Sequence, residues 1–378
     1  MWCENLTSIT VPNGVTSIGE AAFATCHSLK NINIPDSVTN IGNGAFAYCT
    51  SLTNINIPNS VTSISDYAFY ECYSLTSINI PDSVTSIGEA AFAYCESLTS
   101  INIPDSVTSI GEGAFYECSS LVSINVDENN EYYASIDGNL YSKCGKTLVQ
   151  YALGKQDTSF IIPDSVASIG DHTFYGCYSL TSITIPDSVT NIGDYAFYYC
   201  SNLTSVSIGN SVTNIGDYAF YYCSNLTSIT IPDGVTGIGD YAFKDCYSLT
   251  SITIPDSVAS IGDYAFSGCS SLTSITIPDS VTNIGDHAFY ECYSLTSVSI
   301  GNGVTSIGCS AFEYCSGLTK ITIPKSITSI GEWAFYQCYN LKDIYYTGSA
   351  DEWAMIKIDK NNSKITNTTI HYNYVPED

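Results

Sequence analysis

The residues of this sequence that could do chemistry are 16 cysteines, 37 aspartates and glutamates, and four histidines. Thiolates and imidazoles bind zinc, neighbouring thiols form disulfides, and clustered carboxylates bind calcium. The cysteine spacing is the first guide, because fourteen of them keep an interval of 23 residues within two series. The series are Cys3, Cys26, Cys49, Cys72, Cys95 and Cys118, and then Cys177, Cys200, Cys223, Cys246, Cys269, Cys292, Cys315 and Cys338.

This cysteine spacing argues against a metal centre and against a disulfide framework. No two cysteines have the C-x-x-C spacing of zinc ligands. Identical stacked repeats would point equivalent Cβ atoms the same way, whereas a disulfide needs Cβ atoms that converge. We therefore expect buried thiols that pack as small hydrophobic groups, and no bound metal or cofactor. Cys144 and Cys309 lie outside the series and could be accessible, so the sequence leaves their redox state open.

The aspartates also recur with the repeat, in two series, one of them broken by Asn210. Rows of carboxylates could recruit calcium, but no repeat has the dense Asp/Asn pattern of a calcium loop. Aspartate after proline or glycine is explained as well by turn formation, because its side chain bonds nearby backbone N–H groups. We expect turn-forming residues and leave weak calcium binding open. The series are Asp171, Asp194, Asp217, Asp240, Asp263 and Asp286, and Asp164, Asp187, Asp233, Asp256 and Asp279.

The histidines give no sign of catalysis. His172 and His287 occupy a repeat position that carries tyrosine elsewhere, and His27 and His371 are isolated. There is no glycine-rich phosphate loop and no nucleophile elbow, and no serine departs from the repeat as a nucleophile with its own base would. We predict a protein that is not an enzyme and has no catalytic residue.

Charge excludes two classes of partner. The 378 residues include no arginine, and 11 lysines face 37 acidic residues, giving a formal net charge of −26. Such a chain cannot neutralise phosphates, so we expect neither nucleic acid nor anionic membrane surfaces as partners. No run approaches the ~20 apolar residues of a spanning helix, which argues against membrane insertion. Residues 1–6 contain no basic or apolar signal segment, and upstream repeats or a signal peptide could be missing.

The elements that must position these residues come from the 23-residue repeat, which residues 75–95 represent. Ile78 and Ile80 alternate with polar residues, as in a half-buried strand that Pro81 ends. Val84 and Ile87 form a second inward pair, and a helical or turn segment leads to Cys95. One such rung (one 23-residue repeat) cannot bury its apolar side alone, so the rungs must stack into a solenoid.

Fifteen strands follow from the same register, and all of them run parallel. Their central residues are Ile9, Ile32, Ile55, Ile78, Ile101, Ile124, Phe160, Ile183, Val206, Ile229, Ile252, Ile275, Val298, Ile321 and Ile344.

The repeat is interrupted once and ends before the C-terminus. Turn residues at 137–138 and 144–145 between β-prone runs predict hairpins within one rung. Ser349 and Glu352 have the spacing of a helix capping box, and Ile370 begins a last strand. The predicted organisation is a first block of repeats (1–126), a hairpin-bearing insertion (127–159), a second block (160–346), and a C-terminal cap and tail (347–378).

The recurrence of proline, glycine, phenylalanine, cysteine and leucine in register over residues 3–346 resembles the BspA-like leucine-rich repeat family. The resemblance implies a leucine-rich repeat solenoid, β-rich and of the α/β type. Parallel strands would stack on one face, with short second strands and helical turns on the other. It also implies an extracellular or cell-surface protein that mediates adhesion through protein partners, for example host or matrix proteins.

Tyrosine and asparagine supply the candidate interaction surface. Thirty tyrosines occur, many outside the buried positions, and tyrosine gives contact area at low entropic cost. An equally open explanation is that they cover the surface of a long array, and stacked asparagines could simply bond along the solenoid. The candidates are Asn33, Asn56, Asn79, Asn102 and Asn125 on the strand face, and Tyr67, Tyr195, Tyr198, Tyr218, Tyr241 and Tyr264.

The sequence therefore favours a non-catalytic surface or secreted protein that binds other proteins. The alternatives are a structural spacer or an intracellular scaffold in the cytoplasm that holds another module, and a carbohydrate-binding surface protein. The ligand, the rungs that bind it and the oligomeric state are not determined by the sequence.

Overall fold

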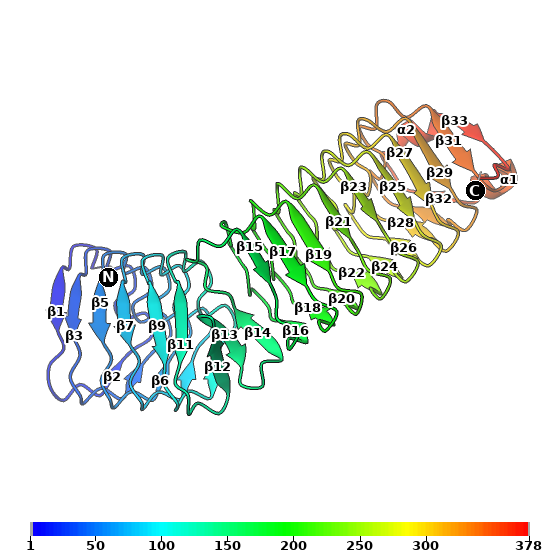
Figure 1. Cartoon of the computed structure of the whole chain (residues 1–378). Helices are drawn as coiled ribbons and strands as arrows, with labels where there is room; N and C mark the ends of the chain where they lie inside the picture. Colours follow the sequence, from blue (N-terminus) through cyan, green and yellow to red (C-terminus); the bar gives the residue numbers. More distant parts are fainter. Residues whose placement is uncertain (1–2, 377–378) are drawn as a thin grey trace. The chain divides into compact units, whose positions relative to one another are not determined.

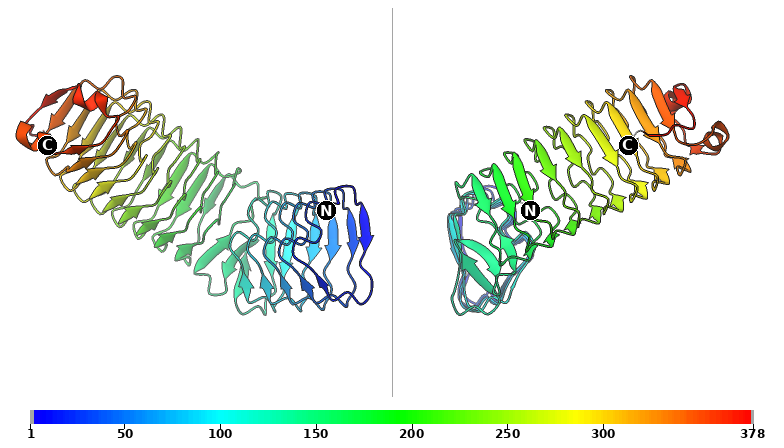
Figure 2. Two further views of the ribbon diagram at one scale, coloured as in Figure 1. Left: turned by 180° about the vertical axis from the view of Figure 1, so that it is seen from behind. Right: turned by 45° about the vertical axis from the view of Figure 1, so that its right-hand side comes forward.

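The computed structural model describes residues 3–376, so the outermost residues of the predicted first block and cap lie outside it. The chain divides into two compact units. Unit 1 comprises residues up to Asp157 together with Ser168–Ser179, and unit 2 comprises Thr158–Ala167 and residues from Leu180 onward. Within each unit the strands lie side by side as stacked rungs of a β-solenoid (Figures 1 and 2).

The first strand of each rung confirms the predicted parallel strands. Partners are offset by one 23-residue repeat, as in Ile55 with Ile78 and Ile183 with Val206. In unit 1 they are β1 (Ser8–Thr10), β3 (Asn31–Asn33), β5 (Asn54–Asn56), β7 (Ser77–Asn79), β9 (Ser100–Ile103) and β11 (Ser123–Val126). In unit 2 they are β15 (Ser159–Ile161), β17 (Ser182–Ile185), β19 (Ser205–Ile208), β21 (Ser228–Thr230), β23 (Ser251–Thr253), β25 (Ser274–Ile277), β27 (Ser297–Ile300), β29 (Lys320–Ile323) and β31 (Asp343–Tyr346).

Outside the insertion, the second strand of each rung is two residues long, and a turn follows it. In unit 1 these strands are β2 (Ser17–Ile18), β4 (Asn40–Ile41), β6 (Ser63–Ile64), β8 (Ser86–Ile87), β10 (Ser109–Ile110) and β16 (Ser168–Ile169). In unit 2 they are β18 (Asn191–Ile192), β20 (Asn214–Ile215), β22 (Gly237–Ile238), β24 (Ser260–Ile261), β26 (Asn283–Ile284), β28 (Ser306–Ile307), β30 (Ser329–Ile330) and β32 (Lys357–Ile358).

The third side of each rung consists of turns rather than helix. Its backbone enters the left-handed region twice, as at Tyr195 (φ 55°) and Tyr199 (φ 58°). A right-handed helix cannot contain such residues, so the helical alternative for this side is replaced by turns. We call this the turn side.

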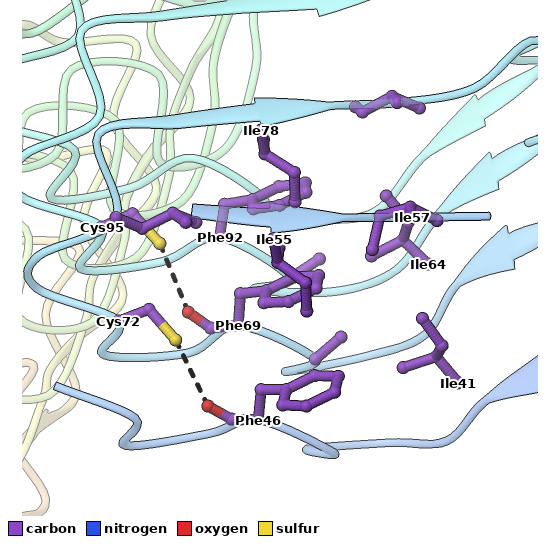
Figure 3. Packing of buried hydrophobic residues seen from close by; sticks show 14 of the residues in the cluster. Ile41, Phe46, Ile55, Ile57, Ile64, Phe69, Cys72, Ile78, Phe92 and Cys95 are labelled. Atoms are coloured by element: carbon purple, nitrogen blue, oxygen red, sulfur yellow. Dashed lines mark hydrogen bonds between the residues drawn. The ribbon is translucent and has the colours of Figure 1, made fainter. Parts of the chain in front are cut away.

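The core is built from columns of identical side chains. Phe46, Phe69 and Phe92 stack with ring centroids 5.5 Å apart at each step (Figure 3). The Sγ of Cys72 donates to the carbonyl oxygen of Phe46 at 3.2 Å, and Cys95 bonds Phe69 in the same way at 3.3 Å. The cysteines thus pack as small core groups whose thiol satisfies a backbone carbonyl.

The interruption consists of two hairpins. Strand β12 (Tyr133–Ile136) pairs antiparallel with β13 (Asn139–Ser142), and β13 pairs antiparallel with β14 (Thr147–Gln150). Both residues of the first turn, Asp137 (φ 50°) and Gly138 (φ 72°), have the positive φ that a tight hairpin requires. Strand β14 then pairs parallel with β16, so the insertion rejoins the solenoid as a second strand.

The C-terminal segment contains the only helices among residues 3–376. Helix α1 (Ala350–Ala354) begins with the expected capping box between Ser349 and Glu352. Helix α2 (Ser363–Thr366) follows, and β33 (Thr369–His371) pairs with β31. Neither helix of this described part is long and apolar enough to cross a membrane.

Candidate binding surface

A column of stacked rings runs along the turn side of unit 2. We call it the ring column, and it consists of Tyr195, Tyr218, Tyr241, Tyr264 and His287. Successive ring centroids lie 4.6, 4.4, 4.7 and 4.3 Å apart, and adjacent planes are within 6° of parallel. All five residues have φ between 55° and 57°, so the same strained turn presents every ring in the same direction.

Backbone hydrogen bonds hold these turns in register. The N–H of Tyr218 donates to the carbonyl oxygen of Asp240 in the next rung at 2.8 Å, and Tyr241 bonds Asp263 in the same way. Since each turn is fixed to the next through its backbone, the rungs set the spacing of the residues that carry the rings. Four of the predicted tyrosines, Tyr195, Tyr218, Tyr241 and Tyr264, are brought together in this column.

Two shorter columns flank the ring column. Tyr198 stacks on Tyr221 and Tyr199 stacks on Tyr222, each pair with centroids 4.7 Å apart. In the next rung, Lys244 occupies the repeat position that carries Tyr198 and Tyr221 in the two preceding rungs. Its Nζ lies 5.6 Å from the ring centroids of Tyr221 and Tyr241 and 5.5 Å from that of Tyr264. One ammonium group therefore contacts three rings.

A row of aspartates lies beside the ring column. Asp217, Asp240 and Asp263 each accept through Oδ1 the backbone N–H of the equivalent residue in the next rung, at 2.7–2.8 Å. The predicted bonds to backbone N–H groups are present, but they run to the next rung, so these aspartates tie rungs together where bonds within the aspartate's own turn were expected. Among residues 3–376, no three acidic, histidine or cysteine side chains are grouped so that they could hold a metal ion.

The hydroxyl groups of three tyrosines in the ring column stay protonated well beyond neutral pH. Burial raises the pKa of Tyr218, Tyr241 and Tyr264 above its ordinary value, and neighbouring tyrosines and aspartates raise it further. These three residues therefore present neutral rings at physiological pH.

The predicted tyrosine of unit 1 stands in a different setting. Tyr67 is 40% exposed, and the equivalent positions before and after it are Gly44 and Ala90. Its hydroxyl donates to Glu89, and this bond raises its pKa to about 12. Tyr67 therefore belongs to no stack of equivalent rings.

The asparagine row lies on the exposed face of the first strands of unit 1. All five predicted residues are exposed, and Asn125 Nδ2 donates to Asn102 Oδ1 at 3.1 Å. Asn79, Asn102 and Asn125 also line a shallow groove together with Pro104 and Asp127. The asparagine row is thus an accessible polar surface in which one side-chain hydrogen bond joins neighbouring rungs.

Comparison with known proteins identifies the family of the chain. A family model described as a BspA type leucine-rich repeat region (6 copies) matches residues 1–122, 39–155, 146–270 and 236–359. The chain belongs to the BspA-type leucine-rich repeat family.

Solved structures of bacterial leucine-rich repeat proteins are similar to it. A protein from Eubacterium ventriosum is 32% identical, with 89% of this chain and 83% of that chain covered and a TM-score of 0.70. A leucine-rich cell surface protein from Faecalibacterium prausnitzii is 32% identical, with 94% and 83% covered and a TM-score of 0.51. A protein from Bacteroides ovatus is 31% identical, with 97% and 92% covered and a TM-score of 0.57. No curated protein matches the chain.

The cysteines of this BspA-type protein are free thiols. Cys144 and Cys309 are exposed, and so is Cys3, which no described rung covers, whereas the other members of the series are buried. Burial raises the pKa of Cys49 and Cys118 to about 12, so these thiols do not ionise at neutral pH. The pKa of Cys144 is lowered by a hydrogen bond with Ser142.

Sequence reasoning missed two members of this surface. His287 was interpreted as a surface substitution for tyrosine, but it continues the ring column at 4.3 Å from Tyr264. Lys244 was not singled out, although its position in the repeat is that of Tyr198 and Tyr221. Alignment of the turn segments at a spacing of 23 residues would have found both.

Proposed function

We propose that this BspA-type repeat protein is a non-catalytic surface or secreted protein that binds other proteins through its turn side and strand face. The observation that carries the proposal is the ring column, which presents five partly exposed rings in register. Repeat solenoids provide extended binding surfaces of this kind. The similar Faecalibacterium prausnitzii protein, described as a cell surface protein, supports the proposed location.

Rigidity is the physical reason why these rings suit binding. A tyrosine has two side-chain torsions, and stacking at 4.4–4.7 Å already restricts both of them. Ordering the surface on binding therefore costs little further entropy. We infer that the ring column with Tyr198 and the exposed asparagines of unit 1 form the contact surface, with weak contacts summed over several rungs.

A spacer or scaffold is the second candidate, and the bonds between rungs favour it. Besides the aspartate row, Ser280 Oγ donates to Val258 O at 2.7 Å and Thr305 Oγ1 donates to Thr282 O at 3.2 Å. A structure tied from rung to rung resists bending and could hold another module at a fixed distance.

Location is tested by brief protease treatment of intact producing cells, with the released peptides quantified against a cytosolic protein. Release of peptides from the turn side while the control stays inside the cells supports the proposal. Retention together with the cytosolic control would contradict a surface role and favour the intracellular scaffold.

Binder and spacer are separated by a pair of matched variants, assayed for attachment of the purified protein to immobilised matrix proteins. The first is Tyr218→Leu with Tyr241→Leu, which removes two rings and leaves the length unchanged. The second deletes residues 229–251, one complete repeat, so that strand register is kept. A binder loses attachment with the first variant. A spacer tolerates that variant and changes only with the deletion.

A further inference from the structure

We propose that a pocket at the end of the turn side of unit 2 binds the ring of a neutral sugar. The pocket has a volume of about 250 Å³ and lies where the last rung meets helix α2. We call it the cap pocket, and it shares no lining residue with the ring column, so the inference goes beyond the proposed function. Its lining includes Phe335, Gln337 and Tyr339 from the last rung, and Asn361, Lys364 and Asn367 from the segment around α2.

The cap pocket exists because the segment around α2 replaces the turn of a further rung. In the rung before the last, Phe312 and Tyr314 each donate their N–H to a carbonyl oxygen of the last rung, at 2.8 and 2.9 Å. In the last rung, the N–H of Phe335 donates instead to Asn362 Oδ1 at 3.1 Å. The N–H of Gln337, which corresponds to that of Tyr314, has no acceptor among residues 3–376. A backbone donor of a pocket-lining residue is thus left for a ligand oxygen.

Tyr339 gives the cap pocket an uncovered aromatic ring. It is 68% exposed, and its ring pairs with no other ring in the described part of the chain. Unlike the inner rings of the ring column, it therefore has no stacked ring over either face. The face of an aromatic ring is negative, and it attracts the weakly positive C–H groups of a sugar ring. A sugar can lie flat on Tyr339 and turn its hydroxyl groups toward the polar side of the pocket.

Side-chain amides supply the hydrogen bonds that a sugar requires. Gln337, Asn361 and Asn367 line the pocket, and each amide group can both donate and accept. Asn361 Nδ2 already donates to Glu332 Oε1 at 2.9 Å, which leaves its Oδ1 to accept from a ligand. A hydroxyl group also donates and accepts, so it matches amides and a backbone N–H better than an acceptor-only carboxylate does.

Size and charge restrict the ligand to one neutral ring. Pockets for drug-sized ligands measure about 300–1,000 Å³, so a pocket of 250 Å³ suits a single sugar unit with the rest of the glycan outside. Among its described lining residues only Lys364 is charged, and Glu332, which bonds Asn361, carries the opposite charge beside it. The formal net charge of −26 disfavours an acidic sugar.

Tyr293 is a matched control within the chain. It occupies the repeat position of Tyr339 two rungs earlier, directly after a buried cysteine, and it is 45% exposed. In that rung the next turn is present, and the N–H of Glu291, the equivalent of Gln337, donates to the carbonyl oxygen of Glu313 at 2.9 Å. Tyr293 therefore reports binding that needs only an exposed tyrosine.

The first experiment applies the full-length protein to a glycan array. The array carries neutral glycans that end in glucose, galactose, mannose, N-acetylglucosamine or N-acetylgalactosamine, and the same cores ending in sialic or uronic acid. We expect binding to at least one neutral glycan and weaker binding to the acidic forms. The neutral glycan with the strongest signal is then titrated against each variant by isothermal titration calorimetry.

Three variants locate the site. Tyr339→Ala with Asn367→Ala should weaken binding about ten-fold or more, since a ring contact and a hydrogen bond, each worth about two- to ten-fold, are lost. Tyr339→Phe keeps the ring and should bind within about two-fold of the natural protein. Tyr293→Ala should leave binding unchanged. Tyr339 and Asn367 are both exposed, so these variants should fold, which thermal unfolding checks.

Loss with the alanine pair, together with retention in Tyr339→Phe and Tyr293→Ala, supports the inference. It is overturned if no neutral glycan binds, if the acidic forms bind more tightly, or if the alanine pair binds like the natural protein. Equal loss with Tyr293→Ala or with Tyr339→Phe also overturns it.

The ring-column variant Tyr218→Leu with Tyr241→Leu separates this inference from the proposed function. If no neutral glycan binds but this variant loses attachment to matrix proteins, the inference fails and the proposed function stands. If glycan binding follows the expected pattern while this variant keeps its attachment, the cap pocket stands and the role of the ring column fails.

Discussion

The turn sides of the two units carry tyrosines in two different arrangements. In unit 1, Tyr48, Tyr70, Tyr94 and Tyr116 meet edge to face, at interplanar angles between 69° and 82°. In unit 2, the rings of the ring column are within 6° of parallel. Both arrangements are built on buried phenylalanine columns with nearly the same ring spacing, 5.5 Å between Phe69 and Phe92 and 5.3 Å between Phe220 and Phe243.

Register explains the difference. In unit 1 the tyrosine alternates between the first and the second residue after the buried phenylalanine, so neighbouring rings are offset and meet at their edges. In unit 2 the tyrosines of the ring column all stand two residues before the buried phenylalanine, in four successive rungs, so their rings lie face to face. The exposed columns can therefore differ between units while the buried columns stay the same.

The largest effect that we expect is the loss of both units at alkaline pH. The pKa of Cys118 is raised by burial from 9.0 to about 12, and that of Cys49 likewise, so stability is fully present below about pH 9. It falls as the pH rises from 9 towards 12, because the unfolded thiols ionise and the folded ones do not. At pH 11 each such thiol lowers the free energy of unfolding by about 2–3 kcal/mol.

Hydrogen exchange of peptides from each unit, followed from pH 8 to pH 11 and corrected for the intrinsic rate, checks this prediction. Because burial also raises the pKa of Cys338 in unit 2 to about 12, both units should lose protection in the same pH range. Loss of protection in one unit alone would contradict the prediction that the two units have equivalent cores.

The next largest effect concerns the buried phenylalanines. Phe69→Ala in unit 1 and Phe243→Ala in unit 2 each remove a ring that is fully buried. Each should lower the free energy of unfolding by about 3–5 kcal/mol through lost burial and the cavity left behind. Urea unfolding monitored by circular dichroism measures both, and a difference above about 2 kcal/mol between them would show that the cores are not equivalent.

A smaller effect is expected at the glycine after the second strand. A Cβ at Gly262 would collide with Oδ1 of Asp240 and lie 2.7 Å from its backbone nitrogen. Gly262→Ala should therefore cost about 1–3 kcal/mol of unfolding free energy, measured by urea titration. Gly237→Ala is the matched control, because its Cβ meets only Ser260 Oγ, at 3.3 Å. Equal costs for the two would show that the contact between rungs does not decide the effect.

The smallest effect tests the aspartate row, which lies beside the ring column. Asp240→Ala removes the acceptor for the N–H of Asp263, a bond of 2.7 Å, and should cost about 0.5–1.5 kcal/mol. Asp240→Asn keeps an acceptor oxygen and should cost less than Asp240→Ala. Thermal unfolding of the two variants measures the loss of stability in each. Equal losses with asparagine and alanine would indicate that the charge, and not the hydrogen bond, stabilises the row.

The sequence alone determined the fold of this protein to the level of individual strands. Apolar residues at a 23-residue spacing can be buried only by stacking, so the central residues of all fifteen first strands followed from the pattern. The hairpin turn at Asp137 and Gly138 and the capping box at Ser349 followed as well. The hairpin turn and the capping box are local, because each depends on residues within a few positions of one another.

Only the tertiary structure decided which exposed side chains act together. The two left-handed residues of each turn exclude a helix and aim the rings of Tyr195 to Tyr264 along one line. The partners of the aspartate row lie one rung away, and two of the three rings around Lys244, those of Tyr221 and Tyr264, belong to neighbouring rungs. The physical reason is that a repeat fixes burial through hydrophobicity, whereas contacts between exposed side chains depend on the register and backbone direction that appear only when rungs are stacked.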